Sequence, residues 1–157
     1  GGERGETGGG RIVDKDFRTY AMHMYNGAPC LSLNGVDGAS WQIYKGAVSA
    51  ADGQWHHVVG TWDGTTVWVY TDGRGNQYSK SGSINRGTTP LRIGCRADGT
   101  PPGGRQFDGQ IDEVRISSLA RSSNWVWAVY QNTASNAVFQ SYGTVVASGR
   151  GTVIYIQ

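Results

Sequence analysis

A pair of β-rich runs joined by a tight reversal constrains the fold of this chain more than any other feature. The first run covers residues 55–62 and the second covers residues 67–70, with Asp63-Gly64 between them and Asp72-Gly73 after them. β-Branched and aromatic residues on both sides of an Asp-Gly dipeptide are typical of an antiparallel hairpin. The sequence therefore predicts such a hairpin near the middle of the chain.

Shorter runs with the same period of two predict strands elsewhere, at residues 20–25, 31–33, 41–44, 91–94 and 111–116. The chain contains 25 glycines, 6 tryptophans and 8 tyrosines, and turn signals recur along it. Many short strands with frequent reversals indicate two packed antiparallel sheets. One segment differs, because residues 123–132 have helical spacing after a serine suited to the N-cap. We expect an all-β, two-sheet antiparallel sandwich with one short helix.

Composition excludes several classes of protein. The chain has 157 residues, of which 38% are hydrophobic and 17% are charged, and its formal net charge is +2. This much apolar surface supports a folded core rather than a disordered tail. No run approaches the ~20 apolar residues of a membrane span, so membrane insertion is not expected. No basic stripe marks a nucleic-acid partner.

The two ends of the chain differ from its centre. Residues 1–10 are glycine-rich and predict a flexible segment. Residues 133–157 predict further strands. The last run is apolar on both faces, which is typical of a strand that other parts of a protein cover on both sides. The sandwich core would then lie within residues 11–121 and the helix within residues 122–132. The candidate assembly strand at the end is formed by Thr152, Val153, Ile154, Tyr155 and Ile156.

Three motifs carry a family resemblance. Residues 52–67 (DGQWHHVVGTWDGTTV), 90–94 (PLRIG) and 107–116 (FDGQIDEVRI) resemble, in this order, the core strands of bacterial laminin-G-like, concanavalin-A-like jelly-roll domains. The resemblance implies a two-sheet jelly roll from a secreted, modular protein that binds sugars or proteins and performs no chemistry. It extends over about residues 11–132.

One departure from the family bears on function. In relatives some strands precede the segment similar to residues 10–15, whereas here only ten glycine-rich residues precede it. Unpaired sheet edges recruit another strand. Either residues 144–157 fold back into the gap, or another chain supplies the strands, or this sequence is a stretch of a longer protein.

The residues argue against an enzyme. Glycoside hydrolysis needs two carboxyl groups about 5–10 Å apart, and catalytic relatives carry Glu-x-Asp-x-Glu or Glu-x-Asp-x-x-Glu on one strand. No such run occurs in this chain, and the adjacent Asp112 and Glu113 would point to opposite faces of a strand. No cofactor is expected to be required. The resemblance implies a structural calcium ion in many relatives, with Asp112 as a candidate ligand.

Aromatic side chains offer a candidate carbohydrate site. Sugars stack on exposed rings that a few polar groups surround. Trp41 and Tyr44 border a glycine-rich loop and are the candidate platform, whereas Trp55, Trp62 and Trp68 are expected in the core. Trp125 and Trp127 of the helix would have one ring packed inward and one outward.

The two cysteines, Cys30 and Cys95, leave two alternatives open, a disulfide or two thiols. Together these features predict an extracellular or cell-surface structural module that associates with copies of itself or with sister domains by strand complementation and forms filaments. The alternative is a module that binds a polysaccharide.

Overall fold

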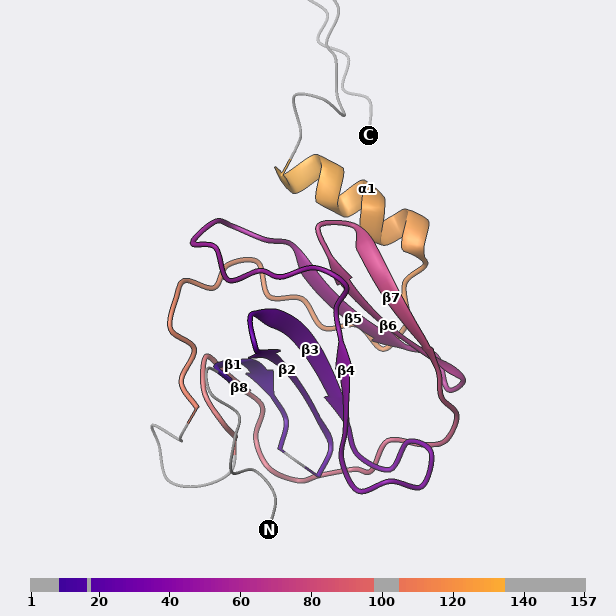
Figure 1. The fold of residues 1–157 in the computed structure, drawn as a ribbon. Coiled ribbons are helices and arrows are strands. Elements are labelled where there is room, and N and C mark those ends of the chain that lie inside the picture. The colour runs from indigo at the N-terminus through magenta and orange to yellow at the C-terminus, as the bar shows by residue number, and fades with distance from the viewer. Residues whose placement is uncertain (1–8, 17, 98–104, 135–157) are drawn as a thin grey trace, which may run out of the picture.

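Two antiparallel sheets face each other in the computed structural model, which describes residues 9–16, 18–97 and 105–134 (Figure 1). The larger sheet has the order β4-β3-β2-β1-β8 and the smaller one the order β5-β6-β7. This arrangement confirms the predicted sandwich. The strands are β1 (Arg11–Asp14), β2 (Tyr20–Tyr25), β3 (Ala28–Leu33), β4 (Gln42–Lys45), β5 (Val58–Trp62), β6 (Thr66–Thr71), β7 (Arg74–Ser79) and β8 (Arg92–Ile93).

Tight turns join neighbouring strands in both sheets. Asn26-Gly27 connects β2 to β3 with φ values of 48° and 77°, and Asp72-Gly73 connects β6 to β7 with φ values of 52° and 75°. Positive φ at both central residues gives the twist that a two-residue hairpin needs. β7 was not predicted, because its sequence RGNQYS is polar and reads as a loop.

The core lies between the sheets. β3 and β4 pack on β6, and β3 also contacts β5. Alternation places Val67 and Val69 of β6 on the inner face, and neither is exposed to solvent. The buried cluster consists of Leu31, Leu33, Val36, Tyr44, Val67 and Val69.

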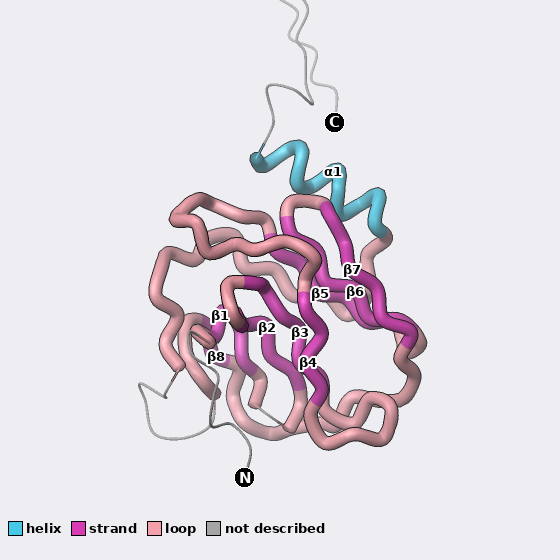
Figure 2. The backbone as a smooth tube through the Cα atoms, in the orientation of Figure 1, coloured by secondary structure: helices cyan, strands magenta, loops and turns pink. Residues whose placement is uncertain are grey.

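The helix α1 (Ser123–Ala134) confirms the predicted helix and lies across one end of the smaller sheet (Figure 2). Ser122 is its N-cap, since the Ser122 Oγ accepts from the Trp125 N–H at 3.3 Å. Trp127 lies close to Gly73 at the β6–β7 turn. The expectation of one inward and one outward tryptophan is wrong: Trp125 is 38% and Trp127 50% exposed, and the buried residue is Val126.

The strand predicted at residues 111–116 is absent from the structure. No strand among the described residues pairs with this segment. Its chain also turns, because Glu113 has a φ of 52° and its N–H donates to Asp112 Oδ1 at 2.8 Å. Alternation alone therefore misled the prediction, since a strand also needs a neighbour to receive its backbone hydrogen bonds.

Parts of the remaining predictions fall outside the described residues. Residues 1–8, which make up most of the glycine-rich segment, lie outside them, and so do residues 135–157, where the C-terminal strands were predicted. Gly10 is described, and its carbonyl accepts from the Met24 N–H of β2 at 3.0 Å. Within the described residues, no helix has the length and apolar character to cross a membrane.

Candidate interaction site

Both edge strands of the smaller sheet, β5 and β7, lack a second neighbouring strand among the described residues, and β5 is the apolar one. β5 pairs with β6 on one side only. Asp72 N–H donates to His57 O and Asp63 N–H donates to Thr66 O, so residues 57, 59, 61 and 63 direct their backbone groups toward β6. The N–H and C=O groups of Val58, Gly60 and Trp62 consequently point away from β6, and no described residue pairs with them.

The inner side of this edge lacks a side chain. A Cβ added to Gly60 would lie 3.1–3.2 Å from the side chain of Leu31 on β3. Residue 60 therefore faces the interior, as do Val58 and Trp62 by alternation. Gly60 is nevertheless exposed, and Val58 and Trp62 are only half-buried. The edge is open to solvent at its centre.

Apolar side chains of β8 and of residues 114–119 are exposed as well. Residue 111 lies beside β8, since the Ile111 side chain is 3.9 Å from the position of a Cβ added to Gly94. Burial lowers the pKa of His57, while the charge of Asp72 raises it and the charge of Arg115 lowers it. The exposed apolar residues are Ile93 (52%), Val114 (37%), Ile116 (58%) and Leu119 (63%).

Tyr44 does not form the predicted exposed platform. Its ring is 3% exposed and lies 5.2 Å from that of Tyr78, centroid to centroid. The reason is that β4 alternates, and Tyr44 falls on the inner face. Trp41 is half-buried, with the Arg11 guanidinium carbon 5.7 Å from its ring centroid. The structure therefore does not bring Trp41 and Tyr44 together on the surface.

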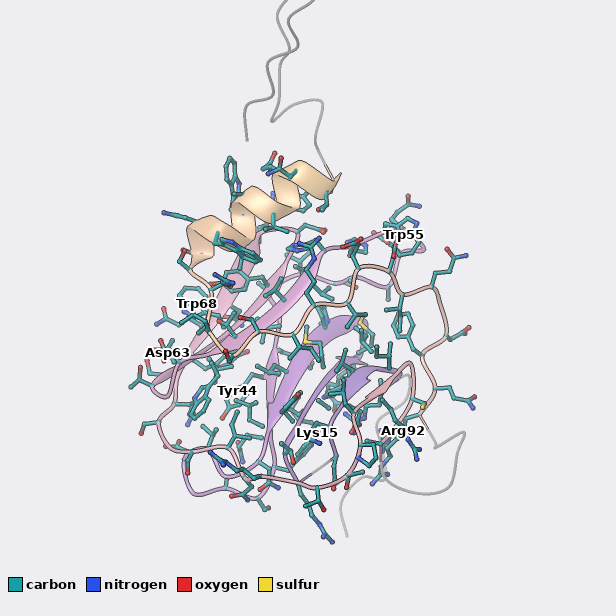
Figure 3. All side chains as sticks on the ribbon, turned by 180° about the vertical axis from the view of Figure 1, so that it is seen from behind. Lys15, Tyr44, Trp55, Asp63, Trp68 and Arg92 are labelled. Carbon is teal, nitrogen blue, oxygen red and sulfur yellow. The ribbon has the colours of Figure 1, made fainter. Side chains whose placement is uncertain are left out.

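Trp55, which the sequence placed in the core, is exposed instead. It is 65% exposed and lies at the periphery of the molecule, away from Tyr44 (Figure 3). It lines a groove of about 1000 Å³. The side chains around that groove include Met24, Gln54, Trp55, Arg105, Gln106, Phe107, Asp108 and Gln110. The turn signal Asp52-Gly53, which ends two residues before Trp55, is the local pattern that indicates a loop position.

The loop that carries Trp55 is fixed by one imidazole. His56 Nε2 lies 2.8 Å from Asp52 Oδ1, and His56 Nδ1 lies 2.7 Å from Asp72 Oδ2. The hydrogen bond to Asp52 is the main cause of a raised pKa for His56. Asp52 Oδ1 also accepts from the Gln54 N–H at 2.9 Å. These contacts join the Trp55 loop to the β6–β7 turn.

The residues around Asp112 do not fit a calcium ion. Calcium takes six to eight oxygen ligands. Asp112 is exposed and its Oδ1 accepts from Glu113 N–H, while Glu113 Oε2 lies 2.7 Å from an Arg115 nitrogen. Nowhere in the described ranges do three or more His, Cys, Asp or Glu side chains gather as a metal site. We assign Asp112 no metal.

The two histidines before β5 have separate contacts. His56 bridges two aspartates, whereas the ring of His57 stacks near Tyr130 of α1 at 6.2 Å between centroids. This arrangement gives both residues structural partners within the fold.

No disulfide joins the two cysteines. Cys30 is buried in β3, and Cys95 follows β8 and is half-buried. Three strand intervals separate β3 from β8 in the sheet order. At about 4.8 Å per interval the separation far exceeds the roughly 7 Å limit between bonded cysteine Cα atoms. Of the two alternatives, the structure has two thiols.

Residues 4–127 match the model of the laminin G family described as the concanavalin A-like lectin/glucanases superfamily. This match spans most of the chain and includes the open β5 edge and the Trp55 groove. The chain belongs to this family. A comparison with curated proteins found no match.

Among solved structures, the chain of this laminin-G-like protein is similar to residues 221–444 of an S-layer domain-containing protein from Clostridium thermocellum. The two are 17% identical, with a TM-score of 0.42. The similarity covers 72% of this chain and 57% of the other.

Proposed function

We propose that this protein is a non-catalytic extracellular module that assembles with copies of itself by adding a strand to the open edge of β5. The observation that carries the proposal is the outward direction of the backbone groups of Val58, Gly60 and Trp62. An edge of this kind is a template for β-augmentation. Family membership supports the extracellular location and a binding role rather than chemistry.

Exposed apolar side chains favour a protein partner at this side of the sandwich. Ile93, Ile116 and Leu119 are each more than half exposed. Large apolar groups left exposed on one surface mark a site that another molecule covers, and the proposal requires that these three side chains be covered in the assembly. The edge supplies the hydrogen bonds, and these side chains would supply additional buried area.

A proline at the edge tests the proposal. Val58→Pro removes a backbone N–H that points away from β6, and proline is tolerated as the first residue of an edge strand. Val58→Ala is the matched control, since it shortens the same side chain and keeps the N–H. We expect the wild type and Val58→Ala to form particles heavier than the 16.9 kDa chain in light scattering, and Val58→Pro to be a monomer.

Near-ultraviolet circular dichroism would show that both variants retain the fold. If Val58→Pro assembled over the same range of protein concentration as the wild type, a role for the β5 edge would be contradicted. A wild-type protein that stays monomeric up to millimolar concentration would contradict self-assembly.

A second candidate function is carbohydrate binding, which the Trp55 groove favours. The exposed indole offers a flat apolar face, and the amides of Gln54, Gln106 and Gln110 lie around the same groove. Aromatic stacking with amide hydrogen bonds suits the faces and hydroxyls of sugars. The loop that carries the ring is held by His56, so the platform is fixed before a ligand binds.

Affinity electrophoresis in gels that contain soluble polysaccharides tests this candidate. We expect a retarded band for the wild type, normal mobility for Trp55→Ala, and wild-type retardation for Trp41→Ala. Equal retardation of Trp55→Ala and wild type in every responsive polysaccharide would exclude Trp55 as the platform.

A further inference from the structure

The geometry of the open β5 edge restricts which strand can pair with it. Because Val58, Gly60 and Trp62 present their backbone groups outward, an added antiparallel strand forms its hydrogen-bonded pairs with these three residues. Their side-chain positions face the interior, where Leu31 lies against Gly60. The added strand therefore needs apolar residues at alternate positions, and a branched side chain opposite the glycine would cover the exposed backbone of residue 60 and pack beside Leu31.

One run of this chain matches those requirements in length and pattern. Residues 152–156 have the sequence TVIYI, five residues long like β5, with apolar residues on both alternations. The whole segment 135–157, outside the described residues, has one charged residue, Arg150. A charge-poor strand suits β5, whose own residues are all uncharged.

We infer that residues 152–156 of a second copy add antiparallel to β5, with Ile154 opposite Gly60; this inference rests on the proposed function. In this register Thr152 lies opposite Trp62 and Ile156 opposite Val58. The pairs of Val59 with Tyr155 and of Thr61 with Val153 fall between them, without mutual hydrogen bonds. Side chains in such pairs lie closest across two strands.

The direction of the strand favours a second copy over the same chain. An antiparallel strand enters at the Trp62 end of β5 and leaves at the Val58 end. The described chain ends at Ala134, about one helical turn beyond Tyr130, which stacks near His57 at the Val58 end. The chain's own segment would have to pass the length of β5 before it turned back, whereas a second copy enters directly. Each copy then has one acceptor edge and one donor strand, a head-to-tail arrangement that continues as a filament.

Cysteine trapping between two separately made variants tests the register and the source of the strand. Both carry Cys95→Ser, and one adds Val59→Cys while the other adds Tyr155→Cys. The control mixture pairs Val59→Cys with Val153→Cys, a shift of two residues along the donor. After mixing and mild oxidation, we expect covalent dimers in the first mixture, at least tenfold faster than in the control.

Each other outcome overturns a stated part. Faster trapping of the control mixture would make the register wrong while strand addition at β5 stands. Absence of trapping in both mixtures, with assembly still blocked by Val58→Pro, would mean that another segment is the donor. A chain that carries both Val59→Cys and Tyr155→Cys and oxidises only to a monomer would show the strand added within one chain, against self-assembly.

A deletion gives an independent readout. The chain ending at residue 151 should remain folded, because it keeps both described sheets and the buried cluster, and it should be monomeric because the donor strand is missing. Ile154→Asp should weaken assembly at least tenfold, whereas Val153→Thr, on the other alternation, should change it less than threefold. Wild-type assembly of the deleted chain would overturn the inference.

Discussion

Leu31 of β3 occupies the space that a side chain at Gly60 of β5 would need, with its carbon atoms 3.1–3.2 Å from the position of an added Cβ. The two residues lie on facing sheets, so this contact sets how closely the edge strand approaches the larger sheet. It also leaves the backbone of β5 accessible at its centre, because residue 60 contributes no side chain of its own.

Gly60→Val should therefore destabilise the protein by about 1–3 kcal/mol through overpacking against Leu31. Leu31→Ala alone should cost about 2–5 kcal/mol, because it leaves a cavity. The double variant should cost less than the sum, since the valine fills part of the space that the leucine vacates. Urea unfolding of all four proteins measures this coupling. Simple additivity would contradict the described contact.

His23 should make the fold sensitive to acid. It is fully buried, its Nε2 lies 2.7 Å from Ser32 Oγ, and burial lowers its pKa to about 4. The unfolded chain binds this proton near pH 6.5, so the associated stability is complete above that pH and is lost between about pH 6.5 and 4. The loss corresponds to about 3 kcal/mol.

Urea titrations at pH 7, 5.5 and 4.5 would measure this loss for the wild type and for His23→Gln. His57, whose pKa is also lowered by burial, contributes with the same sign in both proteins. The variant should show a clearly smaller fall in the free energy of unfolding. An identical fall in both proteins would mean that His23 is not the group responsible.

His56 should act in the opposite direction. Its pKa is raised, chiefly by the hydrogen bond to Asp52, so the folded protein holds this proton more tightly than the unfolded chain. The stability it contributes is present below about pH 6.5 and is lost as pH rises through the raised pKa. Between pH 6 and 8 the free energy of unfolding of the wild type should fall. That of His56→Gln should not show this fall, because the variant lacks the titrating imidazole.

Hydrogen exchange of the amides of residues 52–57 would localise the effect of His56. After correction for the intrinsic rate, opening of this loop should increase with pH in the wild type and stay constant in the variant. A pH-independent loop in the wild type would mean that protonation of His56 does not hold it.

The cysteines should react as two thiols of different accessibility. In the folded protein a thiol reagent should label Cys95, which is half-buried, faster than Cys30, which is fully buried. Unfolding in guanidinium should release the second thiol without a reductant. A mass two units lower, with no thiol titrated, would show a disulfide.

Local sequence was sufficient for the elements that neighbouring residues decide. Asn26-Gly27 and Asp72-Gly73 adopt the positive φ values that their hairpins require. Asn, Asp and Gly tolerate positive φ better than other residues, so these dipeptides alone indicate the turns. Ser122 begins the helix through its own hydroxyl. The motifs near Asp63-Gly64 also sufficed for the family.

Tertiary structure alone decided which faces are covered. Tyr44 and Trp55 are both aromatic residues near predicted strands, yet the first is 3% and the second 65% exposed. Alternation determines which residues share a face, but burial depends on residues distant in sequence that pack on that face. For the same reason, residues 111–116 have the pattern of a strand without a partner among the described residues, and β5 keeps an open edge. Backbone hydrogen bonds between strands are contacts across the fold, which no local pattern specifies.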